Sequence, residues 1–94
     1  MYFKKGQIYK ILNNSTSFRT KDDTKNNIVF LKEDDIVLFL KIENVKVPIP
    51  NSHMTYNTKE TIYFLYNKII VYNNFYNYDK LDWRRFKKNF QRIS

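Results

Sequence analysis

The sequence predicts a mainly β domain, a small five-stranded barrel followed by a C-terminal α-helix. Two observations indicate this fold. Short runs of β-branched and aromatic residues recur through the first three quarters of the chain, and the spacing of apolar residues then changes to three and four. The 94 residues fit one domain. We expect it to span residues 1–94, with the barrel over about residues 3–74 and the helix over about residues 79–93.

The first half of the barrel has three predicted strands. Residues 7–12 are rich in β-branched and aromatic side chains and form the first. The polar residues 13–27 predict a long loop. Residues 28–31 predict the second strand, and the acidic residues 32–35 predict a turn. Residues 36–42 predict the third strand, whose two apolar faces favour a central position in the sheet.

The second half of the barrel contains an edge segment and a hairpin. Residues 45–50 alternate Val or Ile with Lys and Pro. Because proline cannot donate to a ladder, this segment predicts an edge strand or an extended arm. Residues 51–60 predict a second polar loop. Residues 61–66 and 68–72 predict a hairpin in which Asn67 takes the positive φ of a two-residue turn. Short strands with long loops suggest a barrel of SH3-like or OB-like type.

The predicted helix rests on one apolar stripe. Trp83, Phe86, Phe90 and Ile93 are three, four and three residues apart, which places them on a single helical face. Asp79 is the expected N-cap. We therefore expect the aromatic stripe to pack on the barrel and the remaining, mostly cationic positions to face water.

Composition excludes several classes of protein. The chain has no cysteine, which removes disulfides, thiolate zinc sites and cysteine nucleophiles. Eight Phe, eight Tyr and one Trp supply a core large enough for so short a chain. The longest apolar run, residues 36–40, is far shorter than the roughly 20 residues of a membrane helix, and no signal peptide is evident. We expect a cytoplasmic protein that binds no membrane.

The formal net charge of +8 favours a polyanionic partner, either nucleic acid or an acidic host protein surface. The chain also lacks Ala and is rich in Asn, Lys, Tyr, Ile and Phe, as an AT-rich genome would encode. Codon usage is therefore an alternative source of the lysine excess. Position must separate the two explanations.

The candidate binding residues lie near the C-terminus. Residues 61–94 contain seven Lys or Arg against two acids, and three of the four arginines are among them. Such a face would neutralise phosphates, although an ordinary surface helix also needs a solvated side. Two tyrosines before the helix would be available for base stacking. The full set is Lys80, Arg84, Arg85, Lys87, Lys88, Arg92, Tyr76 and Tyr78. We assign Tyr63, Tyr66 and Tyr72 instead to core or cross-strand packing.

Little in the sequence suggests catalysis or a cofactor. The one histidine, His53, lies in a predicted loop without an evident acid or nucleophile partner. No phosphate-binding loop, nucleophile elbow or zinc-protease motif occurs. The acids at 22–23 and 33–35 stand beside lysines and are typical of turns, so we expect no metal. The sequence predicts a non-enzymatic protein without cofactors.

Residues 3–11, Phe-Lys-Lys-Gly-Gln-Ile-Tyr-Lys-Ile, resemble the first strand of the PemK/MazF-type toxin nucleases. The resemblance implies an SH3-like barrel and RNA cleavage by an Arg and a Ser/Thr, for which Arg19 and Thr20 are the matching residues. The family's acid is Gln7 here, and its Gly/Pro-rich loop is missing. The likeness covers nine residues and supports the barrel more than the activity.

Brevity, AT-rich composition and the lack of enzyme motifs also resemble the small orphan proteins of bacteriophages and mobile elements. Two hypotheses follow. In the first, the basic helix contacts nucleic acid or a nucleoprotein. In the second, the chain is a protein-directed inhibitor of a host or defence enzyme, docking through the same helix or by strand addition at residues 45–50. An edge strand would also permit a homodimer.

Overall fold

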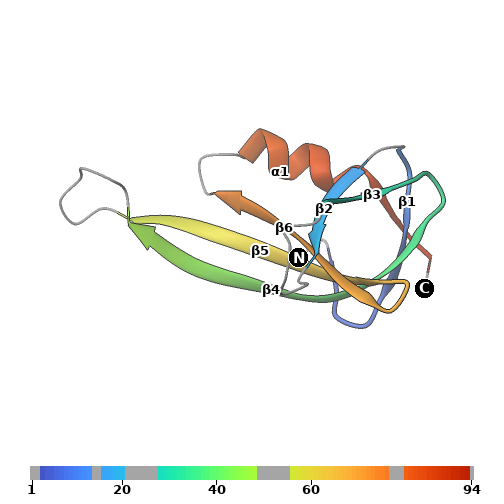
Figure 1. Cartoon of the computed structure of the whole chain (residues 1–94). Coiled ribbons are helices and arrows are strands. Elements are labelled where there is room, and N and C mark those ends of the chain that lie inside the picture. Colours follow the sequence, from blue (N-terminus) through green and yellow to red (C-terminus); the bar gives the residue numbers. More distant parts are fainter. Residues whose placement is uncertain (1–2, 14–15, 21–27, 49–55, 77–79, 94) are drawn as a thin grey trace.

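The computed structural model describes residues 3–13, 16–20, 28–48, 56–76 and 80–93. These residues form a mainly β fold with one short helix (Figure 1). The elements are β1 (Ile8–Ile11), β2 (Thr16–Thr20), β3 (Ile28–Leu31), β4 (Ile36–Pro48), β5 (Tyr56–Tyr66), β6 (Ile69–Tyr76), α1 (Lys80–Lys87) and β7 (Phe90–Arg92).

The strands form one antiparallel sheet in the order β3-β2-β6-β5-β4-β1-β7. The sheet curls, and α1 lies on its inner side, over β6 (Figure 1). Strands β3 and β7 are the two ends of the ladder, so the described residues form an open, curled sheet and do not close a barrel. The distal parts of β4 and β5 extend beyond the other elements as a two-stranded arm.

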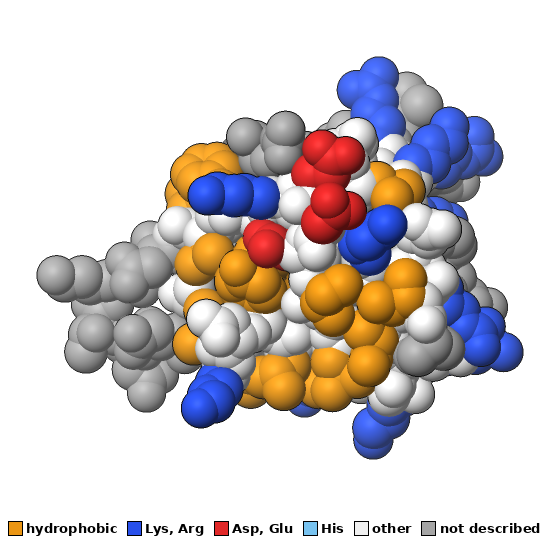
Figure 2. Space-filling model, turned by 90° about the vertical axis from the view of Figure 1, so that its right-hand side faces the viewer, with side chains coloured by type: hydrophobic (Ala, Val, Ile, Leu, Met, Phe, Trp, Pro, Cys, Tyr) orange, Lys and Arg blue, Asp and Glu red, His pale blue; other side chains and the backbone are white. Residues whose placement is uncertain are grey.

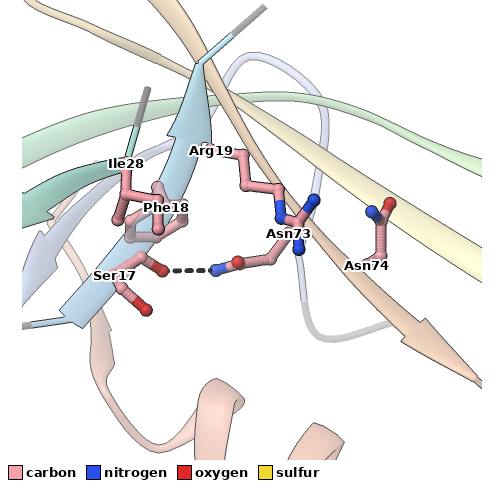
Figure 3. Close-up of a pocket in the computed structure, with 6 residues that line it drawn as sticks. All are labelled: Ser17, Phe18, Arg19, Ile28, Asn73 and Asn74. Atoms are coloured by element: carbon pink, nitrogen blue, oxygen red, sulfur yellow. Dashed lines mark hydrogen bonds between the residues drawn. The ribbon is translucent and has the colours of Figure 1, made fainter. Parts of the chain in front are cut away.

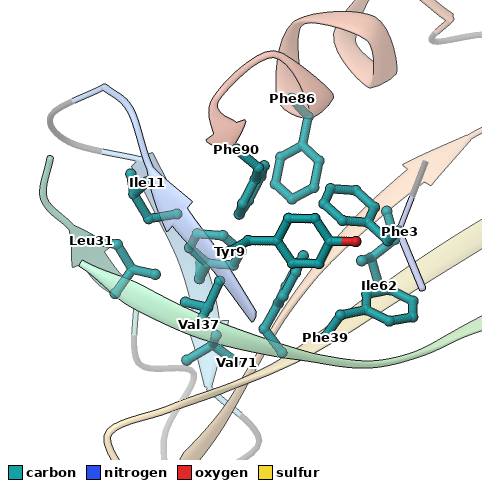
Figure 4. Packing of buried hydrophobic residues seen from close by; sticks show 12 residues of the cluster. Phe3, Tyr9, Ile11, Leu31, Val37, Phe39, Ile62, Val71, Phe86 and Phe90 are labelled. Carbon is teal, nitrogen blue, oxygen red and sulfur yellow. The ribbon is translucent and has the colours of Figure 1, made fainter. Parts of the chain in front are cut away.

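Aromatic rings fill the space between the curled sheet and α1 (Figure 4). Their packing is largely edge-to-face, the geometry that ring quadrupoles favour. Phe64 on β5 is fully buried and contacts rings from the N-terminal segment, β2, β4, α1 and β7. The buried set is Phe3, Tyr9, Ile11, Phe18, Leu31, Val37, Phe39, Ile62, Phe64, Val71, Phe86 and Phe90.

Several predicted elements are confirmed. The strands predicted at 7–12, 28–31 and 36–42 correspond to β1, β3 and the first part of β4, and β4 lies in the interior of the sheet as expected. The predicted hairpin is formed by β5 and β6. Its turn residues Asn67 and Lys68 have φ values of 47° and 70°, the left-handed conformation that this tight turn requires.

The prediction of five strands is wrong, since the sheet has seven. One missed strand, β2, lies inside the segment predicted as a loop. Its polar sequence buries only Phe18, and it is held by backbone pairing with β3 and β6, so it has no apolar pattern to detect. Residues 45–48, predicted as an edge strand or an extended arm, are extended and continue β4, with only β5 paired to them among the described strands. Residues 56–60, predicted as part of a loop, instead begin β5.

The helix is shorter than predicted. It ends at Lys87, and the chain turns at Lys88 and Asn89 before β7 pairs with the free side of β1. Phe90 still reaches the core, but from a strand opposite Ile11. The spacing of Trp83, Phe86 and Phe90 fits a helix, but only Trp83 and Phe86 lie in α1, whereas Phe90 lies in β7. Ile93, the fourth member of the stripe, is exposed. The predicted N-cap Asp79 lies outside the described residues, as do residues 49–55 and His53.

We expect Phe64→Ala to destabilise the domain by about 3–5 kcal/mol, because the ring's contacts are lost and a cavity remains. Urea unfolding followed by circular dichroism measures this. Phe30→Ala is the matched control, since that ring is 63% exposed, and we expect it to change the free energy of unfolding by less than about 0.5 kcal/mol. Equal losses in the two variants would contradict this packing.

Candidate nucleic-acid interface

The predicted basic face is present on α1 and in the turn that follows it. Arg84, Arg85 and Lys88 are exposed. The two ion pairs found among the described residues, Lys10–Asp34 at 3.7 Å and Lys41–Glu43 at 2.5 Å, lie elsewhere. Residues 84–92 contain five cations and no acid. The apolar side of α1 is fixed against the core by Phe86, which leaves the side chains of Arg84, Arg85 and Lys88 facing water.

Lys87 differs from its neighbours. Its Nζ lies 5.2 Å from the centre of the Trp83 ring, a cation–π contact on the half-buried side of the helix. The three basic residues of the last turn, Arg84, Arg85 and Lys87, also stand where the helix dipole favours cations. That interaction contributes about 0.3–1 kcal/mol per residue and gives these cations a structural role whether or not they bind a partner.

The remaining predicted residues do not all join this face. Lys80 begins α1. Arg92 lies in β7 opposite Tyr9, and with the Gln7 amide turned to suit its neighbours, the Gln7 oxygen accepts from Arg92 Nη2 at 2.7 Å. Tyr76 was predicted in a connection but is the last residue of β6, paired with Lys59. Tyr78 lies outside the described residues.

Tyr63 and Tyr72 form a cross-strand pair, as predicted, on the outer face of the sheet. Their ring centres are 5.8 Å apart. The cross-strand neighbours at the two ends of the pair are cations that the sequence analysis did not assign here, Lys41 beside Tyr63 and Arg19 beside Tyr72. Strand register alone places these two cations beside the tyrosine pair. The arrangement could therefore be found only from the pairing of β4 with β5 and of β2 with β6. Tyr66 instead packs against the core.

Glu43 neutralises the charge of Lys41, the cation beside Tyr63. The Tyr63 hydroxyl donates to Glu43 Oε2 at 3.1 Å, and Lys41 Nζ lies 5.1 Å from the centre of the Tyr63 ring. Burial raises the pKa of Tyr63, and the hydrogen bond to Glu43 raises it further. The hydrogen bond that Lys41 Nζ donates to Glu43 Oε1, together with the negative charge of Glu43, also raises the pKa of Lys41. Tyr63, Lys41 and Glu43 therefore contact one another, and the charges of Lys41 and Glu43 cancel.

A polar hollow of about 390 Å³ lies where β2 separates from β6 (Figure 3). Asn73 Nδ2 donates to the backbone oxygen of Ser17 at 3.0 Å beside it. Arg19 lines the hollow, but Thr20, the second residue that the resemblance to the toxin nucleases implies, does not. Arg19 pairs with Tyr72 and Thr20 with Val71, and consecutive strand residues point to opposite faces. The structure therefore separates Arg19 from Thr20. The lining residues are Ser17, Phe18, Arg19, Ile28, Asn73 and Asn74.

A row of apolar residues crosses the outer face of four neighbouring strands, β1, β4, β5 and β6. The register joins Ile8 to Leu38, Leu38 to Leu65, and Leu65 to Ile70. Ile93 extends the row, because its nitrogen donates to the Ile8 oxygen at 2.9 Å. Figure 2 shows hydrophobic side chains gathered at this end of the molecule, with acidic side chains on one side and cations around them. The sequence analysis did not identify this outer apolar row.

Two further questions about the described residues are whether any group could hold a metal ion and whether any helix could cross a membrane. No group of three or more acidic or histidine side chains in the described ranges is arranged to hold a metal ion. No described helix is long and apolar enough to cross a membrane. Comparisons with protein-family profiles, curated proteins and solved structures found no match.

We expect alkaline pH to destabilise the domain partly through Tyr63. Its folded-state pKa is raised, so its contribution to stability is complete below about pH 10, the unfolded value, and is lost as pH rises through the folded value. Urea unfolding of Tyr63→Phe should show a smaller loss between about pH 8 and pH 11 than the parent protein. Tyr66, whose pKa burial and Asp35 also raise, should leave a residual loss. Identical losses in variant and parent would contradict this assignment.

Proposed function

We propose that the protein binds nucleic acid or a nucleoprotein through the exposed cations of α1 and the turn after it, in the cytoplasm of a bacterial host of a phage or mobile element. One observation carries the proposal. Residues 84–92 hold five cations and no acid, and Arg84, Arg85 and Lys88 are exposed without an ion pair to any described residue. Unpaired cations can exchange their small counterions for phosphates without breaking an internal contact.

The fold is compatible with this role. We propose that the open, curled sheet is a variant of the SH3-like fold, in which the adjacent strands β6-β5-β4-β1-β7 take the places of the five barrel strands and the β2–β3 hairpin is added at one end. The core fixes α1 through Trp83 and Phe86, so the basic face is held on a rigid support. A rigid helix presents its cations to a phosphate backbone with little loss of conformational freedom on binding.

We expect the double variant Arg84→Glu, Arg85→Glu to weaken binding of a fluorescein-labelled single strand or duplex while leaving the circular dichroism spectrum unchanged. Loss of two phosphate contacts should reduce the slope of log K against log salt by about 1.4 for a single strand and about 1.8 for a duplex. Fluorescence anisotropy along a salt series measures both.

The matched control is Lys32→Glu, Lys68→Glu, which changes the net charge equally at two exposed lysines outside residues 84–92. The proposed interface requires the control to bind much more tightly than the arginine variant. If both doubles weaken binding to the same extent, the interaction depends on overall charge and not on α1.

The outer apolar row favours a second function, protein-directed binding. Contiguous apolar surface that remains exposed on a small domain commonly marks a protein contact. Ile70 and Ile93, at the two ends of the row, are 40% and 49% exposed. We propose that a host protein covers this row if the chain acts as an inhibitor.

We expect Ile70→Asp, Ile93→Asp to abolish capture of a protein partner from nuclease-treated bacterial lysate, because charges would be buried in the contact. Phe30→Asp is the control, since Phe30 is 63% exposed but lies in β3, at the end of the sheet opposite β7. Capture that persists in the double variant, or that Phe30→Asp removes equally, would exclude the row as the contact surface.

A further inference from the structure

Strand β4 is paired along its whole length on one side but only at its beginning on the other. β5 pairs with β4 from Leu38 to Pro48. On the opposite side, β1 pairs with residues 36–38, and Gly6 N and Gln7 O bond to Phe39 at 3.1 and 3.0 Å. Beyond Phe39 no described strand pairs with this side. Residues 41–48 therefore form an open sheet edge whose backbone groups can take another strand.

A β-bulge in β4 lies where the open edge begins. Phe39 faces Phe64 and Lys41 faces Tyr63, so Leu40 is an extra residue in β4. On the other side the N-terminal segment makes a turn, with Gln7 N bonded to Lys4 O at 3.1 Å and Gly6 at a φ of 81°. An apolar pocket of about 380 Å³ lies between these two features. It is lined by Phe3, Lys4, Lys5, Phe39, Leu40, Lys41 and Ile42.

The lining of the pocket defines what it would accept. Phe3, Phe39, Leu40 and Ile42 supply apolar walls for an aliphatic side chain. Lys4 and Lys5 are exposed and make no ion pair with a described residue, whereas Lys41 pairs with Glu43. The pocket therefore has an apolar interior with an excess of positive charge beside it. An extended segment with an apolar residue flanked by acids matches this combination.

Other occupants fit less well. In an isologous dimer, residues 41–48 would pair antiparallel with the same residues of the second copy. The pocket of each copy would then lie beside the far end of the other edge, where residues 44–48 offer no acid to Lys4 and Lys5. A nucleobase needs hydrogen-bond partners for its edges, and the side-chain walls of this pocket are apolar or cationic. An acidic peptide strand uses both the open backbone of residues 41–48 and the lysines.

We propose that the open edge of β4 binds an acidic, extended peptide segment of a partner protein by strand addition, with an apolar side chain in the pocket beside the bulge. Backbone bonds to β4 give affinity in such complexes, and the pocket and the lysines select the sequence. The site is separate from the exposed cations of α1 and from the outer apolar row, so it does not depend on either proposed function.

The test uses the full chain and a fluorescein-labelled peptide of about eight residues in which Asp or Glu alternates with Ile or Val. We expect saturable binding with a Kd below about 1 mM by fluorescence anisotropy. Methylating alternate backbone nitrogens of the peptide should weaken binding at least about tenfold, because strand addition needs those donors. Replacing the acids with Lys should abolish binding. Amide shifts on titration should concentrate at residues 39–46, with new exchange protection along β4.

Protein variants test the charge selection. Lys4→Glu, Lys5→Glu should weaken peptide binding about tenfold or more, whereas Lys32→Glu, Lys68→Glu should change it little. Absence of saturable binding would overturn the proposal, as would equal affinity for the methylated peptide or displacement of the peptide by a single-stranded oligonucleotide. A dimer by sedimentation velocity, with the β4 amides protected before peptide is added, would assign the edge to a second copy.

Discussion

The fold depends on the burial of one ring near the N-terminus. Phe3 is 1% exposed and contacts six other rings, which come from β1, β4, β5, α1 and β7. Backbone pairing of β7 with β1 and of Gly6 and Gln7 with Phe39 holds these segments at the sheet, and without cysteine no disulfide can add to it. The ring therefore links the N-terminal segment, the sheet and the C-terminal helix, and both the basic face of α1 and the pocket beside β4 are positioned by its contacts.

The sequence predicted those parts of the fold in which apolar periodicity and turn chemistry agree. The β5–β6 hairpin is an example, because alternating apolar residues flank Asn67, which tolerates positive φ. Prediction failed where a strand is held in the sheet mainly by backbone hydrogen bonds and buries few side chains. Strand β2 has one buried side chain, and β7 has one, Phe90, whose spacing from Phe86 also fits a helix. Neither strand carries a local signal that distinguishes it from a loop or a helix.

The candidate surfaces were predictable to different degrees for the same reason. Arg84, Arg85 and Lys88 belong to one helix and its end, so a helical pattern was sufficient to place them together. The pocket beside β4 joins residues 3–5 to residues 39–42, and only the pairing of Phe39 with the N-terminal segment brings those two stretches side by side. The outer apolar row requires three strand registers at once, together with the hydrogen bond between Ile93 and Ile8. Surfaces that depend on register are invisible to local patterns.

The placement of acids bears on whether codon usage accounts for the charge distribution. An AT-rich genome adds lysines anywhere, but it does not remove acids from one region. Three of the described acids have structural partners: Asp35 accepts from the Lys32 nitrogen at 2.7 Å, Asp34 pairs with Lys10, and Glu43 accepts from Lys41 and Tyr63. Residues 84–92 contain no acid and three of the four arginines. The dipole of α1 favours cations in its last turn, and the polyanionic partner proposed above would favour them there as well, whereas codon bias alone predicts no such placement.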